Sequence, residues 1–149
     1  MQSDKPQKHY SSDVPLMGSH EQAKTGQKHI RNEVRGVSVE LLLKSQLISK
    51  GFKVSDPILS TSYDFITEWD GIINTIQVKS ASVHNAKGYC RIEVPVGGYS
   101  VLLAHIGLLE ATYVFPWNEI DRHWICIHMD RPNRYEKWKE KWDVLKETH

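Results

Sequence analysis

The sequence predicts an α/β fold in which a mixed β-sheet is flanked by α-helices. Residues 33–50 carry apolar side chains at helical spacing, and residues 133–146 show a second stripe of this kind. Between them, several short segments alternate apolar and polar side chains, as half-buried strands do. Helices and strands in this order are typical of a sheet with helices packed on its faces.

The first helix is expected at 33–50, with Asn32 as its N-cap and Gly51 at its C-terminal stop. The pair Asp70-Gly71 predicts a tight hairpin turn. Strands are expected at 52–55, 63–69, 72–80, 89–94, 112–115 and 123–129. A short buried helix is expected at 101–109 and a C-terminal helix with an aromatic stripe at 133–146.

The 149 residues fit one folded domain preceded by an arm. We expect residues 1–31 to form a basic, flexible arm, because they hold many Lys, His, Ser and Gln side chains and few apolar ones. Residues 32–149 would then form the folded domain. The arm either tracks DNA or is a solvated tail, and the second interpretation is the simpler one.

Composition narrows the class of protein only slightly. The formal net charge of +1 does not by itself indicate a nucleic-acid-binding protein. We expect a cytoplasmic protein with no membrane partner, because no apolar stretch is long enough to cross a bilayer and the start of the sequence lacks a signal-peptide pattern. Cys90 and Cys126 lack the paired spacing of a zinc site and are expected to be reduced thiols.

Four polar side chains are predicted to converge. Gln77 and Lys79 share one face of their strand, and Asp64 is a carboxylate in an otherwise half-buried strand. Folding the two strands back on the Asp70-Gly71 turn brings them level. Glu40, on the first helix, would supply a second carboxylate, and Gly36 one turn earlier would let that helix approach a strand closely.

An acid, an amide oxygen and an ammonium group suit phosphodiester hydrolysis with a hard metal ion. Each residue also has an ordinary structural explanation. Asp64 would cap a turn, Gln77 would be a surface amide, Lys79 would lie along a sheet edge, and Glu40 would be an exposed helical position. Their joint occurrence favours a nuclease site.

In this order and spacing, the residues resemble the PD-(D/E)XK nuclease superfamily, which has the restriction-endonuclease-like fold. The resemblance spans about residues 36–117 and rests on Gly36-Val37-Ser38-Val39-Glu40, Asp64, Gln77 and Lys79. Tyr63 stands where the motif has proline, and Gln77 stands where it usually has Asp or Glu. A Gln-x-Lys variant is similar to that of small homing-type endonucleases.

This resemblance implies a Mg²⁺-dependent DNA endonuclease, with Mn²⁺ as an expected substitute. Glu40 and Asp64 would hold the metal or position its water, Gln77 would bind through its side-chain oxygen, and Lys79 would orient the nucleophile. Cutting both strands of double-stranded DNA needs two such sites, so a homodimer or homotetramer is expected. Site-specific, homing-type cleavage is the first expectation, and a Holliday junction resolvase or repair nuclease is the alternative.

Further side chains are candidates for phosphate contacts, either around the loop after Lys79 or among the basic residues of the first 35. They are Ser80, His84, Asn85, Lys87 and Arg91, with Lys28, Arg31 and Arg35 nearer the N-terminus. A solvated loop is the alternative for the first group.

Two other classes of protein remain open. One is a DNA-binding module in which Gln77 impairs catalysis. The other is an interaction protein that uses the aromatic stripe of 135–145, although packing of that stripe on the domain's own sheet is the favoured interpretation.

Overall fold

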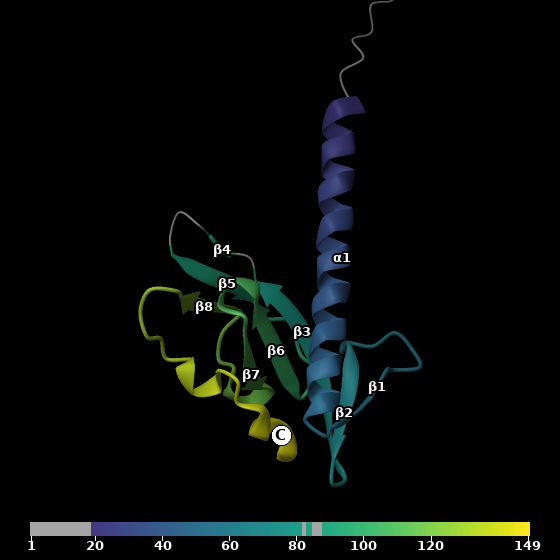
Figure 1. Ribbon diagram of the computed structural model, residues 1–149, viewed down its shortest axis with the longest axis vertical. Coiled ribbons are helices and arrows are strands. Elements are labelled where there is room, and N and C mark those ends of the chain that lie inside the picture. The colour runs from purple at the N-terminus through teal and green to yellow at the C-terminus, as the bar shows by residue number, and fades with distance from the viewer. Residues whose placement is uncertain (1–18, 82, 85–87) are drawn as a thin grey trace, which may run out of the picture. The chain divides into compact units, whose positions relative to one another are not determined.

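The computed structural model describes residues 19–81, 83–84 and 88–149 (Figure 1). The chain divides into two units, Met1–Glu33 and Val34–His149, which are described separately. The described residues of the first unit, 19–33, are helical and include an ion pair between His29 and Glu33 at 3.1 Å. The flexible arm expected over residues 1–31 stays a prediction, and residues 1–18 lie outside the described part.

The helix α1 (Ser19–Ser49) begins earlier than expected, so Asn32 lies inside it and is not its N-cap. Residues 19–33 contain no proline and many Gln, Glu, Lys and Arg side chains, which tolerate a helix well. The predicted stop at Gly51 is confirmed. Gly51 has φ +94°, and the Phe52 N–H donates back to the Leu47 carbonyl at 3.1 Å, as at many helix ends.

Five strands form the main sheet, in the order β1-β2-β3-β6-β7. Only β3 and β6 pair in parallel, so this sheet is mixed. Its strands are β1 (Lys53–Ser55), β2 (Phe65–Trp69), β3 (Ile72–Ala81), β6 (Val101–Ile106) and β7 (Ala111–Pro116). An antiparallel second sheet holds β4 (Val83–His84), β5 (Tyr89–Glu93) and β8 (Trp124–His128).

The hairpin between β2 and β3 is confirmed. Trp69 pairs with Ile72, and the two turn residues between them, Asp70 and Gly71, have φ of +47° and +83°. Positive φ at both positions matches the twist of the flanking strands.

The short helix expected at 101–109 is wrong. Residues 101–106 form β6, and only Gly107–Leu109 (η1) form a 3-10 turn. Val101 and Leu103 lie in one core, while Leu102, Ala104 and Ile106 lie in another. A strand buried on both faces shows no alternation in its sequence, so its periodicity does not distinguish it from a buried helix.

The C-terminal helix expected at 133–146 is also wrong. The segment instead forms two 3-10 turns, η3 (Glu136–Trp138) and η4 (Trp142–Lys146), and a third turn, η2 (Trp117–Glu119), follows β7. Glu140, between η3 and η4, has φ +52°. Its carboxylate accepts hydrogen bonds from the Thr112 N–H at 2.6 Å and from Trp142 Nε1 at 2.8 Å. The contact with Thr112 of β7 and the contact with Trp142 of η4 favour a non-helical path.

The end of this segment packs on the domain's own sheet, as favoured above. Trp142, Val144 and Leu145 lie in the core that also holds Leu43 and Leu47 of α1. The buried Asn74 side chain donates to the Leu145 carbonyl at 3.0 Å and so fixes the segment to β3.

The main sheet is therefore covered on both faces within Val34–His149. Figure 1 shows residues 34–49 of α1 lying along β2 and β3, and the second sheet lying at the end of β3. Side chains of α1 and η4 fill one core, and those of β5 and β8 fill the other. The α/β class with a mixed sheet is confirmed, with α1 as the one α-helix among the described residues.

Both cysteines are free, and Cys90 is buried. Among the residues that the structure describes, no helix is long and apolar enough to cross a membrane.

We expect Leu103→Ala to lower the free energy of unfolding by about 3 kcal/mol, because it would leave a cavity at a fully buried position of β6. Ile73→Ala, at an exposed position of β3, is the control and should cost far less. Urea unfolding followed by tryptophan fluorescence measures both. Equal losses in the two variants would contradict this description of the core.

Candidate active site

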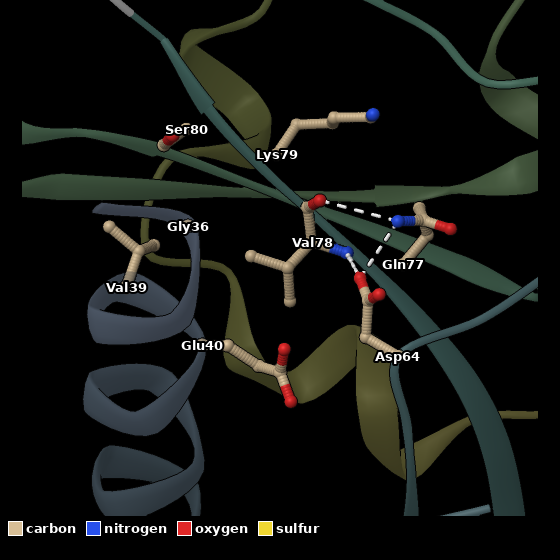
Figure 2. A pocket seen from close by; sticks show the side chains of 8 residues that line it. All are labelled: Gly36, Val39, Glu40, Asp64, Gln77, Val78, Lys79 and Ser80. Carbon is tan, nitrogen blue, oxygen red and sulfur yellow. Dashed lines mark hydrogen bonds between the residues drawn. The ribbon is translucent and has the colours of Figure 1, made fainter. Parts of the chain in front are cut away.

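A cavity of about 400 Å³ opens between α1 and the edge of β3 (Figure 2). It is lined by polar side chains from α1, from β3 and from the residue just before β2, together with two valines and a glycine. The lining residues are Gly36, Val39, Glu40, Asp64, Gln77, Val78, Lys79 and Ser80. The structure thus brings together all four side chains that the sequence predicted to converge.

The cavity exists because β3 is longer than β2. Pairing between the two strands starts at Phe65 and Ile76, so β3 continues past Ile76 without β2 beside it. Asp64 takes the place of the missing strand. Its N–H donates to the Ile76 carbonyl at 2.7 Å, and its Oδ2 accepts the Val78 N–H at 2.6 Å. Both contacts hold the carboxylate of Asp64 at the edge of β3.

Gln77 contacts the same carboxylate. Its Nε2 donates to Asp64 Oδ2 at 2.7 Å and lies 3.3 Å from the Val78 carbonyl oxygen. Figure 2 shows the amide oxygen of Gln77 pointing away from Asp64. The expected binding of a metal through this oxygen therefore requires the amide to rotate, because its nitrogen now lies between two acceptors.

Lys79 extends from β3 beyond Gln77 (Figure 2). No ion pair found in the described part of the chain involves its ammonium group. Its charge nevertheless acts on Asp64, whose pKa it lowers. Lys79 is thus a cation in the cavity wall that is available to a negatively charged ligand.

Glu40 reaches the cavity from α1 and is held by a lysine that the sequence reasoning missed. Lys44 Nζ lies 2.6 Å from Glu40 Oε1 and also contacts Asp56. Partial burial is the largest single influence on the pKa of Lys44 and lowers it, but the hydrogen bonds to Asp56 and Glu40 and their charges together raise this pKa above its ordinary value. Glu40 and Lys44 are four residues apart on α1, a spacing from which the sequence alone predicts an ion pair. The contact with Asp56 depends on the fold of a loop and has no local signal.

The pKa of Asp64 is raised above its ordinary value, chiefly because burial penalises its charged form, and the charge of Glu40 adds to this. The Val78 N–H, Lys79 and Lys44 act in the opposite direction. A raised carboxyl pKa in a polar cavity is typical of functional sites.

Gly36 does not allow the close helix approach that was expected of it. A Cβ added there would meet nothing within 4 Å. The glycine instead leaves open space in the cavity wall. One residue earlier, the exposed Arg35 donates to the Ala81 carbonyl at 3.3 Å and so joins α1 to the end of β3.

Of the other predicted phosphate contacts whose side chains the structure describes, only Ser80 lines the cavity. Arg91 lies on β5, with its guanidinium 3.5 Å from the centre of the Trp124 ring. The backbone of His84 forms part of β4, and Asn85 and Lys87 lie outside the described residues. Lys28 and Arg31 are exposed residues of the first unit.

No group of three His, Cys, Asp or Glu side chains suited to a metal ion occurs within residues 19–81, 83–84 and 88–149. The cavity offers two carboxylates, Glu40 and Asp64, together with the Gln77 amide and the Val78 carbonyl. All of these are oxygen donors of the kind that Mg²⁺ prefers, so the chemistry of the donor set fits this ion.

No protein-family model matches the sequence, and a search of curated proteins finds no match. The structure is similar to that of a bacterial homing endonuclease, I-Ssp6803I, with a TM-score of 0.68. The two sequences are 22% identical, and the match covers 76% of this chain and 89% of that one. This similarity shows that the two chains share a fold.

We expect Asp64→Asn to raise the melting temperature at pH 7 by about 2 to 4 °C, because the neutral amide avoids the cost of burying a charge. A raised carboxyl pKa contributes stability below the unfolded value of 3.8, and that stability is lost as the pH rises through the folded value. The gain should therefore disappear near pH 3. Calorimetry in EDTA measures it, with Asp130→Asn, at an exposed carboxylate that does not line the cavity, as the control. A lower melting temperature for Asp64→Asn at pH 7 would contradict the expectation.

We expect Lys44→Met to raise the pKa of Asp64 further, because the lysine's charge favours the ionised carboxylate. Carbon-13 NMR titration of labelled aspartate side chains measures this pKa. Lys53→Met is the control, since Lys53 is exposed and paired with Glu68. An unchanged or lowered pKa for Asp64 would show that Lys44 does not act on the cavity.

Proposed function

We propose that this chain is a metal-dependent DNA endonuclease of the PD-(D/E)XK type. The observation that carries the proposal is the meeting of Glu40, Asp64, Gln77 and Lys79 around one cavity at the open edge of β3. The shared fold with a homing endonuclease supports it.

Mg²⁺ is the proposed cofactor, with Mn²⁺ as a substitute. Asp64, Glu40, the Val78 carbonyl and the Gln77 amide oxygen would hold it, the last after rotation of its amide. When bound, the ion would supply positive charge that polarises a phosphoryl oxygen. The nitrogen of Gln77 now lies between the Asp64 carboxylate and the Val78 carbonyl, and rotation of the amide would leave both oxygens to the ion.

The chain's own residues would divide the remaining work. Lys79 would place its ammonium group against the scissile phosphate and balance the negative charge that grows on it. Asp64 must lose its proton to bind a cation, and its raised pKa makes this loss depend on pH. Lys44 would hold Glu40 in place on α1.

The proposed substrate is double-stranded DNA, cut at a specific site by a homodimer or homotetramer that supplies two cavities. The homing activity named for I-Ssp6803I favours this substrate over a branched one. Cleavage of four-way junctions or damaged DNA is the alternative within the same chemistry.

A second candidate function is a DNA-binding module without turnover. The hydrogen bond from Gln77 to Asp64 favours it, because an amide nitrogen stands where the family motif usually has an acid beside the aspartate. Such a module would bind DNA through the same face and leave it intact.

We expect the wild-type chain to cut DNA in Mg²⁺ or Mn²⁺ and not in EDTA, and Lys79→Ala to cut roughly 100-fold more slowly or less. Gel assays on supercoiled, linear and four-way-junction DNA measure strand breaks and choose between homing-type and junction cleavage. Lys53→Ala, outside the cavity, is the control and should cut normally. DNA binding without metal-dependent cleavage by the wild-type chain would favour the binding module.

A further inference from the structure

Exposed apolar side chains gather on one element of this protein. Twelve large hydrophobic residues are exposed in the part of the chain that the structure describes, and six of them lie on α1. Two more, Ile58 and Leu59, lie in the loop after β1. Such a concentration on a surface marks a site of contact with another molecule.

Four of the helical residues form what we call the outer stripe: Val34, Val37, Leu41 and Ile48. Their exposed fractions are 60%, 58%, 60% and 59%. At 3.6 residues per turn they lie on roughly the opposite side of α1 from Leu43 and Leu47, which are fully buried against the sheet. Packing on its own domain requires one apolar side of a helix, and α1 has two.

The spacing of the outer stripe points to another helix as the partner. Its members follow one another by three, four and seven residues, which is the repeat of helices that pair side by side. The same spacing continues in the sequence to Ile30, four residues before Val34. A repeat of this kind is complementary to a copy of itself.

The one charged residue on this repeat does not block such a contact. Lys44 occupies the position between Leu41 and Ile48, but its side chain is only 16% exposed. Its ammonium group is bound by Glu40 and Asp56 on the inner side of the helix. Asp56 thereby ties the loop that follows β1 to the inner side of α1.

Small residues border the outer stripe. Ser38 and Ser45, seven residues apart, are both exposed and would allow a second helix to come close. The Ser38 hydroxyl already donates to the Val34 carbonyl within the helix at 2.8 Å. Burying a serine is usually costly because its hydroxyl loses its hydrogen bond to water. The Ser38 hydroxyl would keep its partner within the helix, so covering it would not carry this cost.

We propose that two copies of this chain pair through the outer stripe of α1, helix against helix, around a two-fold axis. The same stripe then serves on both partners, as in other symmetric dimers. The proposal rests on this surface alone and does not require nuclease activity. Its consequence for the proposed function is direct, because Glu40 precedes Leu41 on the paired helix and two cavities would be held at a fixed separation.

Sedimentation velocity of the full chain, without DNA or metal, tests the proposal. We expect the wild-type chain to sediment at twice its mass of 17.2 kDa at micromolar concentration, and Leu41→Asp to sediment as a monomer. Val37→Asp should behave in the same way. Val96→Asp, at an exposed apolar position away from α1, is the matched control and should remain paired.

Circular dichroism distinguishes lost pairing from lost folding. Because both stripe positions are exposed, the variants should keep the wild-type spectrum, and Leu41→Ser replaces any variant that does not. A wild-type tetramer reduced to a dimer by Leu41→Asp would also support the proposal. A monomeric wild type, or an unchanged mass in both stripe variants, would overturn it. Neither result depends on whether the chain cuts DNA.

Discussion

Strand β6 has no exposed face, and this constraint determines where the other elements lie. Its pairing with β3 runs from Ile76 and Val101 to Ala81 and Ile106, so the whole second half of β3 is fixed on one edge. Because β2 is shorter, the other edge of that half is left open. The two layers that bury β6 also set the surroundings of the open edge. The α1 layer supplies Glu40, and β3 continues toward the second sheet. The cavity lies where β3 extends beyond the end of β2 and has no neighbouring strand on that edge.

An open strand edge inside a protein leaves backbone groups that need partners. Here a side chain supplies one, since the carboxylate of Asp64 accepts the N–H that a neighbouring strand would have paired. The backbone therefore positions the acid, and none of the ion pairs among the described residues joins a lysine to it. The lysine that is bound, Lys44, serves Glu40 instead. The two carboxylates of the cavity thus differ in their surroundings. Burial raises the pKa of Asp64, whereas Glu40 is paired with Lys44.

Structural features that depend on residues close together in the sequence can be predicted from it. The turn at Asp70-Gly71 and the alternation along β3 predict from the sequence that Asp64 lies beside Gln77, and Gly51 predicts the end of α1. Features that depend on distant partners were not readable. Residues 101–106 form a strand because layers from elsewhere in the chain cover both faces. The C-terminal segment is not helical because the Glu140 carboxylate accepts a hydrogen bond from the distant Thr112 N–H. The contact between Lys44 and Asp56 requires a loop conformation that its residues do not specify by themselves.

The position of Trp142, Val144 and Leu145 in the core beside α1 bears on synthesis at the ribosome. The helix and the first strands emerge early, but the core that they share stays incomplete until residue 145 has left the exit tunnel. The hydrogen bond from the buried Asn74 side chain to the Leu145 carbonyl likewise cannot form before residue 145 is available. We therefore expect the core beside α1 to close only once residue 145 is available, and the apolar face of the main sheet that this core covers to stay exposed until then.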